Sequence, residues 1–138
     1  MSKIKVADFY YGAVLSMLFS HGIKPALVEN GADRQVYDIT TDKSEFRLYV
    51  KYRANKNNTK KLDYSSWVFT IKDDTAELQS YINNGYKLIV TLVCGEENLG
   101  ESQLAVLDTE QITEIINSGK KNNQCHNQKG RACIQNPD

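Results

Sequence analysis

Polar and apolar residues alternate along one nine-residue run near the middle of the chain, residues 45–53. The apolar residues of this run fall on one side, and they are Phe46, Leu48, Val50 and Tyr52. The other side carries Glu45, Arg47, Tyr49, Lys51 and Arg53. A period of two predicts a half-buried β-strand, here with its charged side open to solvent.

Helical spacing recurs in three segments. A first helix is predicted over residues 6–20, with Gly22 just past its end. A second is predicted to begin at Asp73-Asp74-Thr75, where acids favour the positive end of the helix dipole, and to end at Gly85. A third is predicted to be capped by Thr109 and to end at Gly119. The residues expected to face inward are Tyr10, Val14, Met17 and Leu18 in the first helix, Leu78, Tyr81 and Ile82 in the second, and Ile112, Ile115 and Ile116 in the third.

Further strands are predicted between these helices. They cover residues 26–29, 34–41, 64–71, 88–93 and 104–107. The run 88–93 is apolar on both faces, which is typical of a central strand covered on both sides, and Trp67 and Phe69 are expected in the core. The order αββββαββα predicts the α/β or α+β class, with a central mixed β-sheet and flanking helices.

Size and composition indicate one ordinary globular domain. The chain has 138 residues, of which 41% are hydrophobic and 25% charged. Residues 1–119 are expected to fold, whereas the polar residues 120–138 predict a loosely ordered tail. No apolar run is long enough for a membrane span, and three cysteines make no disulfide framework, so a cytoplasmic location is expected.

Charge is balanced overall but unevenly placed. Lys+Arg and Asp+Glu number 17 each, so the whole chain has no net attraction to nucleic acid. Residues 46–62, however, contain basic side chains and no acid. Phosphate contacts need such side chains, although a solvated loop has the same composition. The candidate nucleic-acid or partner contacts are Arg47, Tyr49, Arg53, Lys56, Lys60 and Lys61.

The element order over residues 6–94 and the lysine of the 45–53 strand resemble the PD-(D/E)xK, or restriction-endonuclease-like, superfamily. That core is a helix, a three-stranded meander, a second helix and a further strand. The resemblance implies that an aspartate of the second strand and the acid of an acid-x-Lys motif hold Mg²⁺, while the lysine assists the attacking water. Asp38 matches that aspartate, and Lys51 matches the lysine. Tyr49 occupies the position of the second acid, so Glu29 is the candidate for the missing carboxylate.

The register of the hairpin decides where Asp38 lies. If Asp42 and Lys43 form a two-residue turn, Asp38 pairs with Arg47 and is a cross-strand ion pair. If the loop is longer by two residues, Asp38 faces Tyr49 instead. Both registers keep the same residues on the apolar face, so burial cannot choose between them.

Other candidate chemistry is weaker. Cys125, His126 and Cys133 lack a paired C-x-x-C and a fourth ligand, which disfavours a zinc site. Cys94 lies in a strand predicted to be buried, where a thiolate is disfavoured.

These features predict a divergent, inactive PD-(D/E)xK-like domain that binds DNA through the 47–61 basic face, or one that retains metal-dependent phosphodiester cleavage. The alternative is a non-catalytic protein-interaction or accessory, inhibitory module of a bacterial or phage system that uses the same strand face. A dimer fits either function.

Overall fold

The computed structural model describes residues 3–31, 33–54, 57–58, 64–70, 74–96, 100, 102–118, 122–128 and 134–137. For residues 57–58, 64–70, 122–128 and 134–137 the description covers the backbone alone. The elements are α1 (Val6–Ser20), β1 (Ala26–Glu29), β2 (Gln35–Thr40), β3 (Glu45–Arg53), β4 (Asn57–Asn58), β5 (Tyr64–Thr70), α2 (Thr75–Asn83), β6 (Leu88–Cys94), β7 (Gln103–Leu107), α3 (Thr109–Asn117), β8 (Asn122–Gln128) and β9 (Ile134–Pro137).

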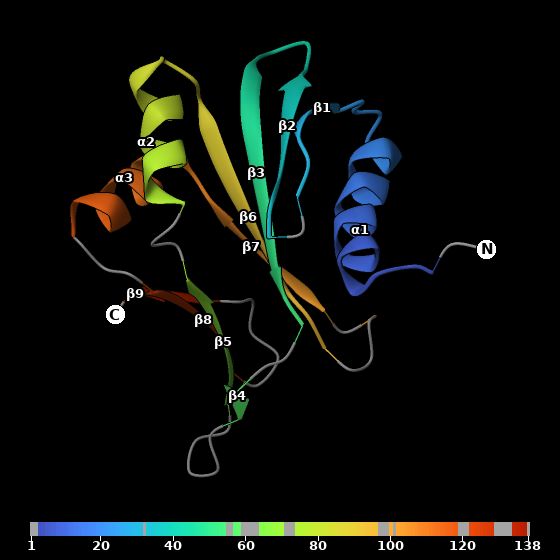
Figure 1. The fold of residues 1–138 in the computed structure, drawn as a ribbon, viewed down its shortest axis with the longest axis vertical. Coiled ribbons are helices and arrows are strands. Elements are labelled where there is room, and N and C mark those ends of the chain that lie inside the picture. The colour runs from blue at the N-terminus through green and yellow to red at the C-terminus, as the bar shows by residue number, and fades with distance from the viewer. Residues whose placement is uncertain are drawn as a thin grey trace.

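A five-stranded mixed sheet in the order β1-β2-β3-β6-β7 forms the centre of the molecule. Neighbouring strands are antiparallel except β3 and β6, which run parallel. A parallel pair needs a crossover connection, and α2 lies in the connection between β3 and β6. Figure 1 shows α1 on one side of the sheet and α2 and α3 on the other. The predicted α+β class with a mixed sheet and flanking helices is confirmed.

Each side of the sheet has its own core. On the α1 side, Tyr11 and Val14 pack over Leu48 and Val50 of β3. On the other side, residues of α2 and α3 cover the residues of β3 and β6 that point the opposite way, Tyr49 and Leu92 among them. The expectation that the polar side of β3 is open to solvent is therefore wrong, because α2 lies over it and Tyr49 has 0% exposure.

The predicted ends of α1 and α2 are confirmed, and Gly119, the predicted end of the third helix, lies outside the described residues. Gly22 and Gly85 adopt φ values of 75° and 85°, the left-handed conformation that closes a helix at little cost for glycine. Two other predictions for the helices are wrong. Met17 was expected to be buried but is exposed on α1. The N-cap of α3 is Asp108, whose carboxylate accepts the Gln111 N–H at 2.9 Å, rather than Thr109.

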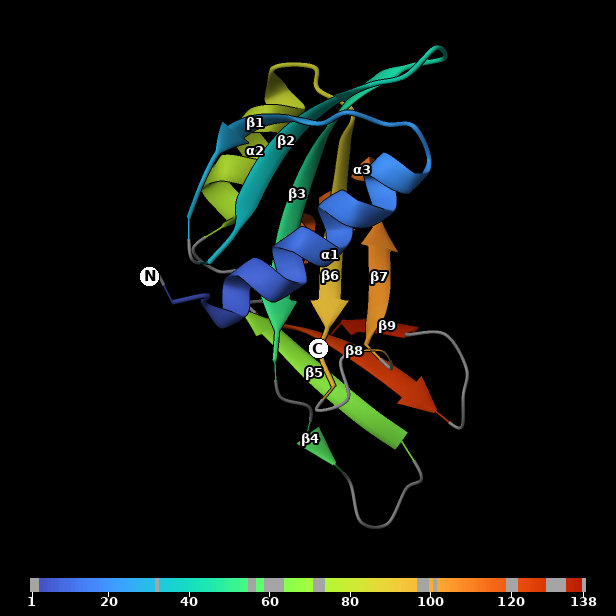
Figure 2. The same ribbon diagram turned by 90° about the vertical axis from the view of Figure 1, so that its right-hand side faces the viewer.

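A second, four-stranded sheet in the order β4-β5-β8-β9 lies beyond the end of β3 (Figure 2). Strands β8 and β9 come from the segment that was expected to be a loose tail, and β8 pairs along the whole of β5. The side chains of Trp67 and Phe69 lie outside the described residues. No helix in the described part of the chain has the length and hydropathy that a bilayer span requires.

Thr109 links α3 to the sheet. Its Oγ1 receives the Leu88 N–H at 2.8 Å and donates to the Leu88 carbonyl at 2.9 Å. Thr109→Val keeps the side-chain volume and leaves both groups of Leu88 without this partner, so the free energy of unfolding should fall by about 1–2 kcal/mol in urea denaturation. Thr113→Val removes only a bond to a helical carbonyl and should change stability by less than half as much. Equal losses in the two variants would contradict the linking role.

Candidate functional site

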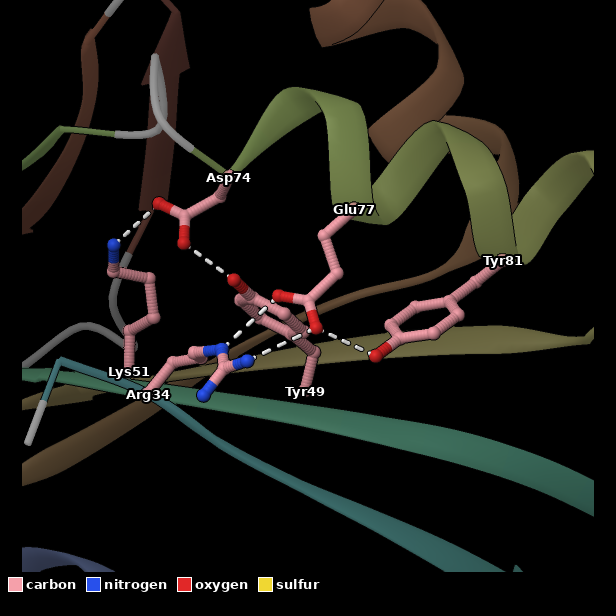
Figure 3. Close-up of polar contacts among 6 residues, drawn as sticks. All are labelled: Arg34, Tyr49, Lys51, Asp74, Glu77 and Tyr81. Carbon is pink, nitrogen blue, oxygen red and sulfur yellow. Dashed lines mark hydrogen bonds and ion pairs between the residues drawn. The ribbon is translucent and has the colours of Figure 1, made fainter. Parts of the chain in front are cut away.

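The polar side of β3 faces α2, and six side chains form a hydrogen-bonded group between them (Figure 3). We call this group the β3–α2 cluster. It comprises Arg34, which precedes β2, Tyr49 and Lys51 of β3, and Asp74, Glu77 and Tyr81 of the α2 segment. The cluster brings the lysine predicted from the sequence together with two acids that the sequence did not single out as site residues.

Asp74 connects the start of α2 to β3. It occupies the N-cap position, but its carboxylate makes no capping hydrogen bond. Instead, one oxygen accepts the Tyr49 hydroxyl hydrogen bond and the other lies 2.5 Å from the Lys51 Nζ. Asp74 is only 7% exposed. A buried carboxylate is costly unless it is paired, and here a phenol and an ammonium group satisfy one oxygen each.

Glu77 lies one helical turn beyond Asp74 and forms the second half of the cluster. The Arg34 guanidinium donates to both of its oxygens, at 3.0 and 3.1 Å, and the Tyr81 hydroxyl donates at 2.6 Å. Burial opposes ionisation of Glu77, but the hydrogen bonds from Arg34 and Tyr81 outweigh it and lower its pKa. Glu77 is thus a carboxylate fully engaged by donors from the sheet and from its own helix.

Tyr49 stands at the position where the nuclease motif has an acid. Burial, followed by the hydrogen bond to Asp74, raises the pKa of its phenol. The side chain therefore stays neutral and donates a hydrogen bond to Asp74. A neutral phenol is not the charged oxygen ligand that Mg²⁺ prefers.

Asp38 forms a cross-strand ion pair with Arg47, as predicted for the two-residue hairpin turn. It is paired in register with Arg47, and its two oxygens accept from the Arg47 guanidinium at 2.9 and 3.1 Å. The same guanidinium lies over the rings of Tyr81 and Tyr86, at 4.7 and 3.9 Å from their centroids. Asp38 is therefore held away from Lys51, which lies four residues beyond Arg47 on β3.

The remaining predicted residues do not gather around Lys51. Glu29 is on β1, opposite Val36, which in turn lies opposite Tyr49. Arg47, at 8% exposure, is buried like Tyr49, so neither side chain is available to a nucleic acid or partner in this structure. Arg53 is exposed. Lys56, Lys60 and Lys61 lie outside the described residues.

The donor set does not fit the magnesium site that the resemblance implies. Asp38 has both oxygens bound by Arg47, and Glu29 is separated from Tyr49 by a strand. Within the part of the chain that the structure describes, no group of three or more His, Cys, Asp and Glu residues is arranged to hold a metal ion. The side chains of Cys125, His126 and Cys133 fall outside that part.

Cys94 is a buried thiol with no role in this cluster. Desolvation raises its pKa to about 12, so the thiol is protonated near neutral pH. This agrees with the interpretation of Cys94 as a small core residue.

Comparison with known proteins adds no relative. No family model, curated protein or solved structure matches this chain. The resemblance to nucleases therefore stands on element order and on residues of the chain itself.

Sequence reasoning missed the roles of Arg34, Asp74 and Glu77. Asp74 and Glu77 are three residues apart, which places them on one face of a helix, and this spacing was the available signal. Acids in a first helical turn are common for dipole reasons alone, so the spacing did not distinguish a cap from a contact to the sheet.

Tyr49→Phe removes the hydroxyl that Asp74 accepts from and leaves one buried carboxylate oxygen without its donor. We expect the free energy of unfolding to fall by about 1–3 kcal/mol, measured by urea denaturation at pH 7. Tyr86→Phe is the matched control, because Tyr86 is partly exposed and its ring keeps its position beside Arg47. A Tyr49→Phe protein as stable as the wild type would contradict the role assigned to this hydroxyl.

Glu77 should make stability depend on pH on the acid side. Because its pKa in the folded protein lies below the ordinary value of 4.5, the unfolded chain binds the proton more readily. Its contribution is complete above the ordinary pKa and is lost as pH falls through the folded value. Unfolding free energies between pH 2 and 7 should fall less steeply below pH 4.5 for Glu77→Gln than for the wild type. Glu110→Gln, which changes an exposed acid of α3, is the control and should keep the wild-type slope.

Proposed function

We propose that this protein is a non-catalytic nucleic-acid-binding domain on a nuclease-like scaffold. The observation that carries the proposal is the pairing of Asp74 with Tyr49 and Lys51. In this arrangement the motif lysine holds α2 against the sheet, and the binding function falls to basic residues beyond the end of β3.

The topology of the main sheet supports the scaffold. α1 is followed by three antiparallel strands, β1 to β3, and the crossover through α2 leads to β6, parallel to β3. This order resembles the helix, meander, helix and strand of the nuclease core, although β4 and β5 stand between β3 and α2 in the chain. Because folds host many functions, the scaffold alone supports no reaction.

The chemistry of the cluster supports binding rather than cleavage. Metal-assisted phosphodiester cleavage needs carboxylate oxygens that are free to coordinate the cation. Both oxygens of Asp74 and both of Asp38 accept hydrogen bonds from side chains of β3. Lys51 is ion-paired with Asp74 rather than directed at a substrate.

The charge pattern near the end of β3 supports a nucleic-acid ligand. Two of the basic residues in 46–62, Arg47 and Lys51, are paired inside the fold. Arg53 is exposed at the end of β3, and Lys56, Lys60 and Lys61 follow it in the sequence with no acid among them. Contacts of this kind go to phosphates, so binding should be insensitive to base sequence and sensitive to salt.

The test is fluorescence anisotropy with labelled DNA duplexes and single strands from 50 to 200 mM salt. We expect affinity to fall steeply with salt, and Arg53→Glu to weaken binding and reduce the slope of log K against log salt by about one. Lys43→Glu, the same charge change in the exposed turn at the opposite end of β3, should leave both unchanged. Equal behaviour of the two variants would count against the proposed surface.

A plasmid assay with Mg²⁺ or Mn²⁺ tests the non-catalytic part. We expect no nicking by the wild type, and DNA binding by folded Lys51→Ala at wild-type affinity. Metal-dependent nicking that is lost in Lys51→Ala would show that the cluster is catalytic and would overturn this part of the proposal.

A further inference from the structure

The outer face of α1 is apolar, although helix faces that contact water usually carry charged residues. From Phe9 to Ser20 the helix contains no charged side chain. One side of α1 packs on the sheet through Tyr10, Tyr11 and Val14. On the opposite side Phe9 is 51% and Phe19 58% exposed, and Val6 and Met17 are exposed too. Such a helix has the composition of one that is covered on both sides.

Two more exposed apolar side chains lie on the α1 side of the sheet, one on each of its opposite edge strands. Leu27 of β1 lies opposite Tyr37, and Val106 of β7 is two residues from Leu104, so both point to the α1 side of the sheet. Both are exposed, and Figure 2 shows α1 lying across this side of the molecule. Ile4 and the exposed residues of α1 alone present an apolar side-chain area on the order of 500 Å², with roughly 150–250 Å² for a fully exposed aromatic side chain and less for the others. Only a little more than half of a typical interface is non-polar. A stable interface buries about 800 Å² per partner.

Along the outer face of α1, large and small side chains follow each other in the same order from either end of the helix. One row holds Phe9, Gly12, Ser16 and Phe19, spaced three, four and three residues apart, in the order large, small, small, large. All four residues are exposed, and a Cβ built on Gly12 meets no atom within 4 Å. In an antiparallel pair of such helices, Gly12 of one copy meets Ser16 of the other, and Phe9 meets Phe19. The small residues allow the backbones to approach, and the aromatic rings close the two ends.

We propose that the outer face of α1 is the interface of a homodimer, in which two copies of α1 pack antiparallel about a two-fold axis near Val14. A two-fold interface must be complementary to itself, so that each contact occurs twice. The palindromic row meets that condition, and none of its four residues is charged, so a partner of opposite charge is not needed to neutralise it. The inference depends on α1 alone and is independent of nucleic-acid binding.

The first test is the mass in solution of the full chain, by light scattering and sedimentation velocity. We expect about twice the 15.7 kDa of one chain. In Phe9→Glu the dimer dissociation constant should rise roughly 30-fold or more, the effect of losing an aromatic contact that the two-fold axis repeats. Ala76→Glu places the same charge on the exposed side of α2 and should leave the dimer intact. Circular dichroism checks that both variants are folded.

The second test fixes the direction of the helices. In a background with Cys125→Ser and Cys133→Ser, a mixture of Gly12→Cys and Ser16→Cys proteins should form a disulfide dimer faster than either protein alone. Faster cross-linking within each single variant would indicate parallel helices and overturn the arrangement. A wild type that is monomeric at 100 µM, or a dimer that Phe9→Glu leaves unchanged, would overturn the interface. A monomer that binds neutral phosphatidylcholine vesicles would assign the face to a lipid surface instead.

Discussion

The pairing of Asp74 with Tyr49 and Lys51 is the interaction on which the arrangement of the α2 side depends. α2 belongs to the crossover between the parallel strands β3 and β6, so it has to lie on the sheet. The side of β3 that it covers carries a guanidinium, a phenol and an ammonium group, each of which is costly to bury without a partner. Two carboxylates meet this constraint: Asp38 of β2 pairs with Arg47, and Asp74 at the start of α2 pairs with Tyr49 and Lys51.

The same constraint bears on the nuclease resemblance of β3 and on our proposal that the domain is non-catalytic. A catalytic carboxylate has to offer oxygens to a metal ion, whereas a carboxylate under a helix is stable only when those oxygens are already bonded. Removing one partner from such a buried pair costs several times what the pair contributes, since the other charge is left unpaired. The cluster therefore favours one placement of α2 on the sheet, which is a different use of the lysine from the orientation of a nucleophilic water.

Local patterns predicted much of the fold but not the partners across it. The helix Val6–Ser20 and the strand Glu45–Arg53 were read correctly because periodicity and Gly22 are local signals. Alternation on β3 was read as one buried and one open side, since polar residues usually face water. Tyr49 and Lys51 are paired with Asp74, which lies over twenty residues further along the chain, and no period reports such a pair. The hairpin register was open for a related reason, because both registers keep the same faces. The strands β8 and β9 carry few apolar residues, so their pairing with β5 left no hydrophobic pattern to detect.

The two sides of the sheet place the proposed functions apart from each other. On the α2 side the charged groups of the cluster are paired inside the fold, and the exposed Arg53 lies at the end of β3. On the α1 side the outer face of the helix is apolar and free of charge from Phe9 onward. A dimer formed through α1 would carry two copies of the basic segment that begins at Arg53. Each segment alone makes few phosphate contacts, and a second one attached to the same DNA acts at a high effective concentration. If both proposals hold, the dimer would make the sequence-independent contact twice, which would raise the affinity of a chain that has no net charge of its own.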